Sequence, residues 1–188
     1  IEKVLPDLSD SIPLQLKRAQ LIEETKGSKD ALEMLLDLNA MNPRTPQLLA
    51  AIAETYSNLN QPENAIKKAQ EALNAADEKL SAKEHLSTLT LLGRLWRKTG
   101  SLDQSVFYLN EAIEKDPTNS ASFVELGRCY QEQRLFERAL QHFQNAIELS
   151  PEDFQPYYYA GLTFKETKDF ANAERMFKFA AKLAPRNI

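Results

Sequence analysis

The sequence predicts an all-α fold, a solenoid of five helix-turn-helix repeats. The first observation is a series of small residues at intervals of 34 positions, Gly93, Gly127 and Gly161. The second is a series of prolines with the same interval, Pro117, Pro151 and Pro185. The third is the helical spacing of the apolar residues between them. Self-similarity with a period of this length is typical of repeat architectures.

The apolar residues around Gly127 predict a pair of helices. Phe123, Leu126 and Tyr130 are spaced by three and four residues, which places them on one face of a helix. A second stripe follows a break at 133–135 and is formed by Ala139, Phe143 and Ala146. Each repeat is therefore predicted to be two helices joined by a short turn.

Small residues and prolines have different roles in this pattern. Two helices approach closely only where neither presents a bulky side chain, so the glycine series marks helix crossings. The prolines end the second helices, because proline lacks the N–H group and clashes with the preceding turn. Gly27 and Gly100 are expected at turns between paired helices, where a left-handed backbone conformation is needed.

These residues resemble the signature of a known family. Phe123-x2-Leu126-Gly127-x2-Tyr130, followed by Ala139-x3-Phe143, Ala146 and Pro151, is similar to the tetratricopeptide repeat. The resemblance implies a right-handed superhelix in which the first helix of each repeat lines a concave surface. It also implies a role in binding another protein or a peptide.

The predicted organisation follows from the same intervals. The repeats span 12–45, 46–79, 86–119, 120–153 and 154–187, and residues 1–11 are a linker or an irregular N-terminal cap. The step from Ala53 to Gly93 is six residues longer than the others, so 80–85 is interpreted as an insertion. Because Asp77 takes the place of the terminal proline, we expect the preceding helix to run on through 80–85.

The two ends of the array are expected to differ. The first repeat has Gln15 and Arg18 at positions that are apolar elsewhere, as a wetted terminal cap requires. No polar capping helix follows the last repeat, so Phe177, Phe179 and Leu183 should form an exposed apolar edge. That edge would meet a continuing chain or make a homo-oligomer with another copy.

Composition and charge exclude several functional classes. A net charge of -4 and a pI near 5.4 argue against nucleic-acid binding and against an anionic membrane surface. There is no run of about 18 to 20 apolar residues that could span a membrane, and no signal peptide is recognisable at the N-terminus. A single cysteine, Cys129, favours a soluble cytoplasmic protein. Since the chain begins with Ile1, we expect it to be a fragment of a larger protein.

The sequence offers no catalytic, metal-binding or cofactor-binding site. His85 and His142 have no ligand-like partner at metal spacing, and Cys129 has no histidine nearby in sequence. We expect solvated or packing roles for all three. No glycine-rich phosphate loop is present. The chain is therefore predicted not to be an enzyme.

The aromatic residues separate into two groups. The first is expected in the core because its members share repeat positions, and it comprises Trp96, Tyr130, Phe164, Phe123 and Tyr157. Tyr158 and Tyr159 differ, since the helix turns them away from the packing stripe. They are expected to face the inner groove.

The resemblance also indicates which side chains meet a partner. Carried over by repeat position, the partner-binding residues of the concave groove are Arg94, Arg97, Lys98, Arg128, Tyr158, Tyr159 and Lys165. This set would hold an extended peptide that carries acidic groups or a free carboxylate. The alternative is internal pairing of the arginines with Glu54, Glu125 or Glu132. The lysine and asparagine clamp of chaperone-binding members and the asparagine ladder of another subtype are both missing.

Three functions remain open at this stage. The leading hypothesis is a protein-interaction scaffold that binds a partner in the concave groove. The second is a regulatory domain of a larger enzyme whose catalytic part lies outside this sequence. The third is a self-association module that uses the exposed C-terminal repeat.

Overall fold

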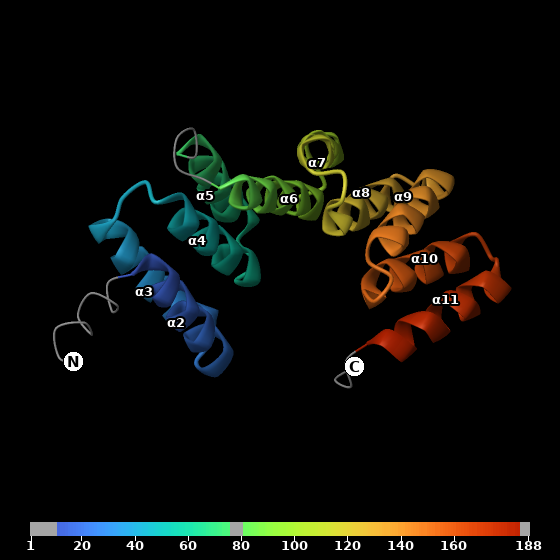
Figure 1. Ribbon diagram of the computed structural model, residues 1–188, viewed down its shortest axis with the longest axis horizontal. Coiled ribbons are helices and arrows are strands. Elements are labelled where there is room, and N and C mark those ends of the chain that lie inside the picture. Colours follow the sequence, from blue (N-terminus) through green and yellow to red (C-terminus); the bar gives the residue numbers. More distant parts are fainter. Residues whose placement is uncertain (1–10, 76–80, 185–188) are drawn as a thin grey trace. The chain divides into compact units, whose positions relative to one another are not determined.

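The computed structural model describes residues 11–75 and 81–184 of the chain. The described residues form ten α-helices and no strand, which confirms the all-helical prediction. The chain divides into two compact units, Ile1–Thr99 and Gly100–Ile188 (Figure 1). The predictions for the linker at 1–10, for Asp77 and for Pro185 lie outside the described residues.

The described residues of each unit form five helices. In the first unit they are α2 (Ile12–Thr25), α3 (Ser28–Met41), α4 (Pro46–Asn58), α5 (Pro62–Asn74) and α6 (Ala82–Lys98). In the second unit they are α7 (Leu102–Lys115), α8 (Ser120–Glu132), α9 (Phe136–Leu149), α10 (Phe154–Glu166) and α11 (Phe170–Leu183). The helices α7 and α9 end just before Pro117 and Pro151, as predicted from the proline series.

The helices stack as a solenoid of repeats. Within each unit, every helix contacts the next one along the chain. The first helices of successive repeats also contact each other, α2 with α4, α4 with α6, and α8 with α10. Among the described residues no comparable contact joins α3 to α5 or α9 to α11. The first helices are therefore the more closely packed row and form the inner side of each unit.

Two glycines allow a close approach between paired helices. A Cβ atom on Gly127 would lie 2.5 Å from the ring of Phe143, which is fully buried. A Cβ atom on Gly161 would lie 2.7 Å from the ring of Phe177, which is half-buried. The sequence prediction of helix crossings at these two glycines is confirmed, and each crossing has an aromatic ring on the opposite helix.

Three of the turns inside the repeats share one hydrogen-bonding pattern. Arg134 has φ of 61°, and its N–H donates to the carbonyl of Gln131. The N–H of the next residue, Leu135, donates to the carbonyl of Tyr130. This is a Schellman motif, which satisfies the last carbonyls of α8. Asn60 and Lys168 repeat it with φ of 57° and 64°. Gly27 and Gly100 have φ of 108° and 80°, so the left-handed conformation predicted for them is confirmed.

The prediction that the second helix of the second repeat runs on through 80–85 is wrong. Helix α5 ends at Asn74 and does not run on through 80–85. Residues from Ala82 instead lengthen the following helix, α6. The side chain of Ser81 accepts a hydrogen bond from the backbone N–H of Glu84, whose carboxylate accepts one from the N–H of Ser81. This capping box starts α6 four residues early, and its Ser-x-x-Glu spacing was readable in the sequence.

The core is aliphatic more than aromatic. All five aromatic residues predicted for the core are only half-buried: Phe123, Tyr157, Trp96, Tyr130 and Phe164. The largest fully buried side chains are leucines, an isoleucine and a single aromatic, Phe143. The half-buried aromatics cover this core, because a two-layer array of helices is too thin to enclose large rings on every side.

Candidate peptide-binding site

A pocket of about 260 Å³ lies on the inner side of the first unit. The helices α2, α4 and α6 supply its walls, and Leu35 of α3 contributes to its floor. The buried part of the lining is mostly apolar and includes Ala19, Leu35 and Leu91. The pocket is therefore a hollow formed by the first helices of three successive repeats.

Small residues on the middle helix create this hollow. Helix α4 presents Ala50 and Ala51 to the pocket. The next first helix, α6, has Thr90 and Leu91 at the same repeat positions, and these are larger. A side chain of ordinary size at either alanine would occupy much of the space. The pocket thus follows directly from two alanines in the sequence of α4.

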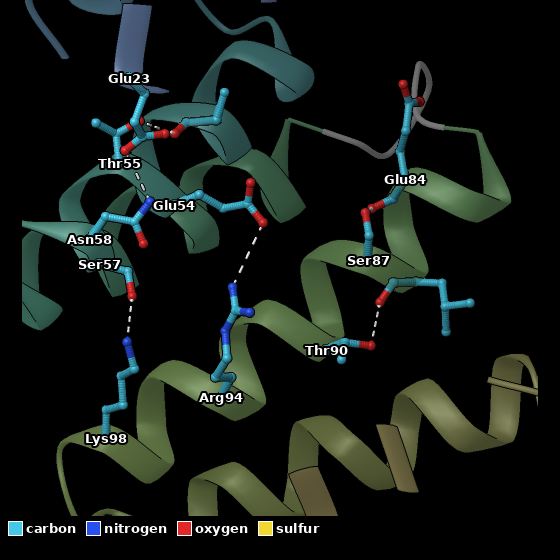
Figure 2. A network of polar contacts seen from close by, with 12 residues as sticks. Glu23, Glu54, Thr55, Ser57, Asn58, Glu84, Ser87, Thr90, Arg94 and Lys98 are labelled. Carbon is cyan, nitrogen blue, oxygen red and sulfur yellow. Dashed lines mark hydrogen bonds and ion pairs between the residues drawn. The ribbon is translucent and has the colours of Figure 1, made fainter. Parts of the chain in front are cut away.

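The polar lining includes three glutamates, which come from three different helices. Glu23 lies on α2, Glu54 on α4 and Glu84 on α6, and no lysine or arginine among the described residues lines the pocket. Glu23 Oε1 accepts hydrogen bonds from Ser28 Oγ at 2.6 Å and from Asn58 Nδ2 at 3.0 Å (Figure 2). These neutral donors orient the carboxylate without cancelling its charge.

Glu84 is held in its ionised form by the helix terminus. The backbone N–H of Ser81 lowers the pKa of Glu84, and the side chains of Ser81 and Gln47 act in the same direction against the opposing effect of burial. A carboxylate in the first turn of a helix is also favoured by the helix dipole. Glu84 therefore contributes a negative charge to the pocket at neutral pH.

Glu54 has a cationic partner, but the contact is loose. Its Oε1 lies 3.7 Å from Arg94 NH2, and the two side chains are 59% and 39% exposed (Figure 2). Lys98, one turn further along α6, donates to Ser57 Oγ at 3.0 Å. The pairing of Arg94 with Glu54 agrees with the internal-pairing alternative from the sequence. An ion pair this exposed contributes little to stability and exchanges easily.

In the second unit, cationic and aromatic residues gather on α8 and α10. Arg128 NH1 lies 3.0 Å from Glu125 Oε1, and the Arg128 guanidinium sits 4.4 Å from the centre of the Tyr159 ring. The rings of Tyr158 and Tyr159 are 5.5 Å apart, and Tyr158 is 6.0 Å from Phe177. Lys165 is exposed on α10. This face combines a guanidinium with aromatic rings that contact each other edge-on or at a tilt.

The seven predicted partner-binding residues fall into two groups. Arg94, Arg97 and Lys98 lie on α6 in the first unit, and the other four lie on α8 and α10 in the second. Arg128, Tyr158 and Tyr159 are brought together, as the preceding contacts show. Arg97 departs from the expectation of an open groove residue, because it is buried, with 7% exposure. Its aliphatic stem and charged group are enclosed and not presented to solvent.

The sequence-based selection missed the residues of the pocket. It chose cationic and aromatic side chains in the last three repeats and left out the first two. The same repeat positions in those two repeats supply pocket-lining residues, namely Leu16, Gln20, Glu23, Gln47, Ala50, Ala51 and Glu54. The signal was present as a pair of alanines on α4, but a hollow is not evident from side chains chosen for their charge.

Other chemistry has little support in the part of the chain that the structure describes. No group of three or more histidine, cysteine or acidic side chains is placed there to hold a metal ion. No helix in the same residues is long and apolar enough to cross a membrane. Cys129 is buried, and its Sγ lies 2.9 Å from Ser105 Oγ. The Cys129 side chain packs in the core with Leu109 and Leu126.

Comparison with known proteins identifies the repeats. Two family models, both described as tetratricopeptide repeat, match residues 48–83 and 108–141. The anaphase-promoting complex subunit CDC16 of Saccharomyces cerevisiae is 28% identical over 109 residues. That match includes 58% of this chain and only 12% of the yeast protein.

Solved structures show the same fold. A fragment of MamA from Desulfovibrio magneticus aligns with a TM-score of 0.71 at 18% identity, covering 91% of this chain and 93% of that one. PilF of Pseudomonas aeruginosa aligns with a TM-score of 0.75 at 15% identity, covering 93% and 77%. YrrB is described as a tetratricopeptide repeat protein with an unusual peptide-binding site. It aligns with a TM-score of 0.62 at 18% identity, covering 99% of this chain and 93% of that one. The two family matches, together with the repeat signature, show that the chain contains tetratricopeptide repeats, and the solved structures show that it shares their fold.

Proposed function

We propose that this chain is a non-catalytic protein-interaction scaffold that binds a peptide segment of a partner along the inner side of its first helices. The observation that carries the proposal is the pocket over Ala50 and Ala51, whose lining comes from the first helices of three repeats. Its walls combine apolar and polar side chains, as peptide-binding grooves do. The names of YrrB and of the yeast subunit, which refer to a peptide-binding site and to a complex, accord with this role.

The second unit contributes a different kind of contact. Lys165 is exposed, and Tyr158 and Tyr159 present aromatic surface beside Arg128. We propose that these four residues contact acidic or carboxylate groups of the partner. Arg128 already faces Glu125, so a ligand carboxylate must compete with that glutamate. The predicted set also contains Arg94, Arg97 and Lys98 of α6, but Arg94 faces Glu54 of the pocket in the first unit. Arg97 is the weakest member of the set because it is buried.

Selection of peptides from a random library displayed on phage would test the proposal. The purified chain is expected to enrich peptides whose binding is lost in Ala50→Trp, because the indole fills the pocket. The matched control is Lys67→Trp, on the exposed side of α5, which should bind the same peptides unchanged. Enriched peptides that bind Ala50→Trp as well as the parent chain would contradict binding in this pocket.

Self-association is a second candidate, and exposed phenylalanines favour it. On α11, Phe170 is 66% exposed and Phe179 is 44% exposed, and two shallow hollows border them. Apolar surface of this kind is typical of interaction sites. Light scattering after size exclusion is expected to show a concentration-dependent dimer that Phe179→Lys removes. A monomer at every concentration would exclude this role.

The cellular setting is also a proposal. We propose a cytoplasmic location within a larger protein, supported by Cys129, which is buried and is the single cysteine of the sequence. The short coverage of the yeast relative accords with a module of a longer chain. Fractionation of cells that express the tagged full-length gene product would test the location.

A further inference from the structure

We propose that the pocket of the first unit binds a basic peptide segment, in which a leucine-like side chain fills the hollow and a neighbouring lysine or arginine pairs with Glu54. The inference rests on the proposed function and specifies the ligand for this unit. It is opposite in charge to the acidic ligand expected from the arginines of α6 and α8.

The hollow itself selects an aliphatic side chain. Ala50, Ala51 and Leu91 are apolar, and the hydroxyl groups of Thr55 and Thr88 are already used. Thr55 donates to the carbonyl of Ala51 at 2.9 Å, and Thr88 donates to that of Glu84 at 2.8 Å. A volume of about 260 Å³ is just below the range of about 300–1,000 Å³ for drug-sized ligands. It therefore suits one or two side chains of an extended peptide.

The charge around the hollow selects a cation beside that side chain. In the part of the chain that the structure describes, the lining carries three glutamates and no basic residue. The hydrogen-bond donors to the carboxylates of Glu23 and Glu84 are neutral groups, so both carboxylates keep their negative charge. A lysine stem can lie along the apolar wall while its ammonium group reaches the rim.

Glu54 is the carboxylate best placed to accept this cation. It is the most exposed of the three, and its separation of 3.7 Å from Arg94 exceeds that of a strong hydrogen-bonded pair. A ligand cation can therefore replace Arg94 at small cost. Arg94 then competes with the ligand cation for Glu54. In a groove that binds acidic peptides, Arg94 would instead bind the ligand carboxylate.

This opposition gives a test in which two variants change affinity in opposite directions. The probes are fluorescein-labelled nine-residue peptides in which leucine alternates with lysine, with glutamate or with glutamine, and anisotropy reports binding to the full chain. The lysine peptide is expected to bind at least about tenfold more tightly than the glutamate peptide at low salt. Raising the salt should reduce that difference, because exposed charges are screened.

Single substitutions assign the contacts. For the lysine peptide, Glu54→Gln should weaken binding about threefold and Arg94→Gln should strengthen it by a similar factor. Ala51→Leu should remove binding by filling the hollow. Glu33→Gln, exposed on α3 and outside the pocket lining, is the matched charge control and should change nothing. Circular dichroism of each variant confirms that it is folded.

Each other outcome overturns the inference. If the glutamate peptide binds more tightly, or if Arg94→Gln weakens the lysine peptide, the ligand is acidic and the inference is wrong. If all three peptides bind equally and Ala51→Leu still removes them, peptide binding in the pocket stands and only the stated charge preference fails. If none of the three peptides binds, the inference is wrong and the phage selection decides the proposed function independently.

Discussion

At the scale of single residues, the turns of the repeats hold non-glycine residues in a glycine conformation. Lys168 has φ of 64° and is exposed at the end of α10. The left-handed conformation costs about 1–2 kcal/mol for a residue that has a Cβ atom, and glycine avoids this cost. Glycine also raises the conformational entropy of the unfolded chain, which cancels part of the gain in stability. Lys168→Gly is therefore expected to raise the free energy of unfolding by about 0.5–1 kcal/mol. Urea unfolding followed by circular dichroism measures this.

The control for this prediction is a β-branched residue at the same position. Lys168→Val should lower the free energy of unfolding, because valine tolerates the left-handed region worst. Equal stability of the glycine and valine variants would show that the Schellman turn imposes no strain at this site.

His142 makes stability depend on pH. Its ring stacks between Tyr130 at 5.2 Å and Phe123 at 6.1 Å, and its buried Nδ1 has no hydrogen-bond partner among the described residues. Burial lowers the pKa of His142 below its ordinary value of 6.5. The unfolded chain therefore binds the proton more tightly than the folded chain. The contribution of the neutral His142 ring to the free energy of unfolding is complete above pH 6.5. It is lost as the pH falls from 6.5 through the lower pKa of the folded state.

Replacement of the imidazole tests this pH dependence. The wild-type chain should show a free energy of unfolding that decreases between pH 7.5 and 5.5, and His142→Phe should show a smaller decrease. The carboxylates with lowered pKa, such as Glu84, lose their contribution only at more acidic pH. Identical slopes in the two proteins would mean that His142 does not carry the effect.

At the scale of helix pairs, the two glycine crossings predict different sensitivities. Gly127→Ala forces a Cβ atom against Phe143, which is fully buried and cannot move aside. Overpacking costs about 1–3 kcal/mol, of which the better helix propensity of alanine returns about 1 kcal/mol. Gly161→Ala faces the half-buried Phe177, which can rotate outward. We expect a net loss of up to about 2 kcal/mol for Gly127→Ala and close to none for Gly161→Ala.

A double variant locates the cause of this loss. In Gly127→Ala combined with Phe143→Leu, the smaller side chain makes room, so the two costs should be less than additive. Thermal unfolding of the single and double variants gives the coupling. Full additivity would show that the ring of Phe143 is not the obstacle.

At the scale of the whole molecule, no single core joins all ten described helices. The chain divides into two compact units, and within each unit every helix contacts its neighbours along the chain. Stability in such an array is a sum of repeat and nearest-neighbour terms. The single tryptophan, Trp96, lies in the first unit and reports on that unit alone.

This position of Trp96 predicts probe-dependent unfolding. Gly127→Ala lies in the second unit, so it should lower the urea midpoint seen by circular dichroism more than the midpoint seen by tryptophan fluorescence. Equal shifts by both probes would mean that the two units unfold as one cooperative block.

Much of the fold was readable from the sequence because its cause is local. The interval of 34 residues, the prolines after α7 and α9, and the glycines at the crossings each specify a backbone feature within one repeat. The early start of α6 was also local, in the spacing of Ser81 and Glu84, although the prediction extended α5 instead. Local patterns of this kind depend only on side-chain size and on backbone hydrogen bonding.

The binding surface depended on tertiary structure. Arg94 and Glu54 are forty positions apart, and only the packing of α6 against α4 brings their side chains within 3.7 Å. The same packing places Ala50 and Ala51 beneath an open pocket. Only the structure shows that Arg97 is buried. The sequence alone determined that paired helices stack, because small residues at regular intervals permit close approach. The tertiary structure decided which charges are paired and where space remains, because both are properties of side chains that meet from different helices.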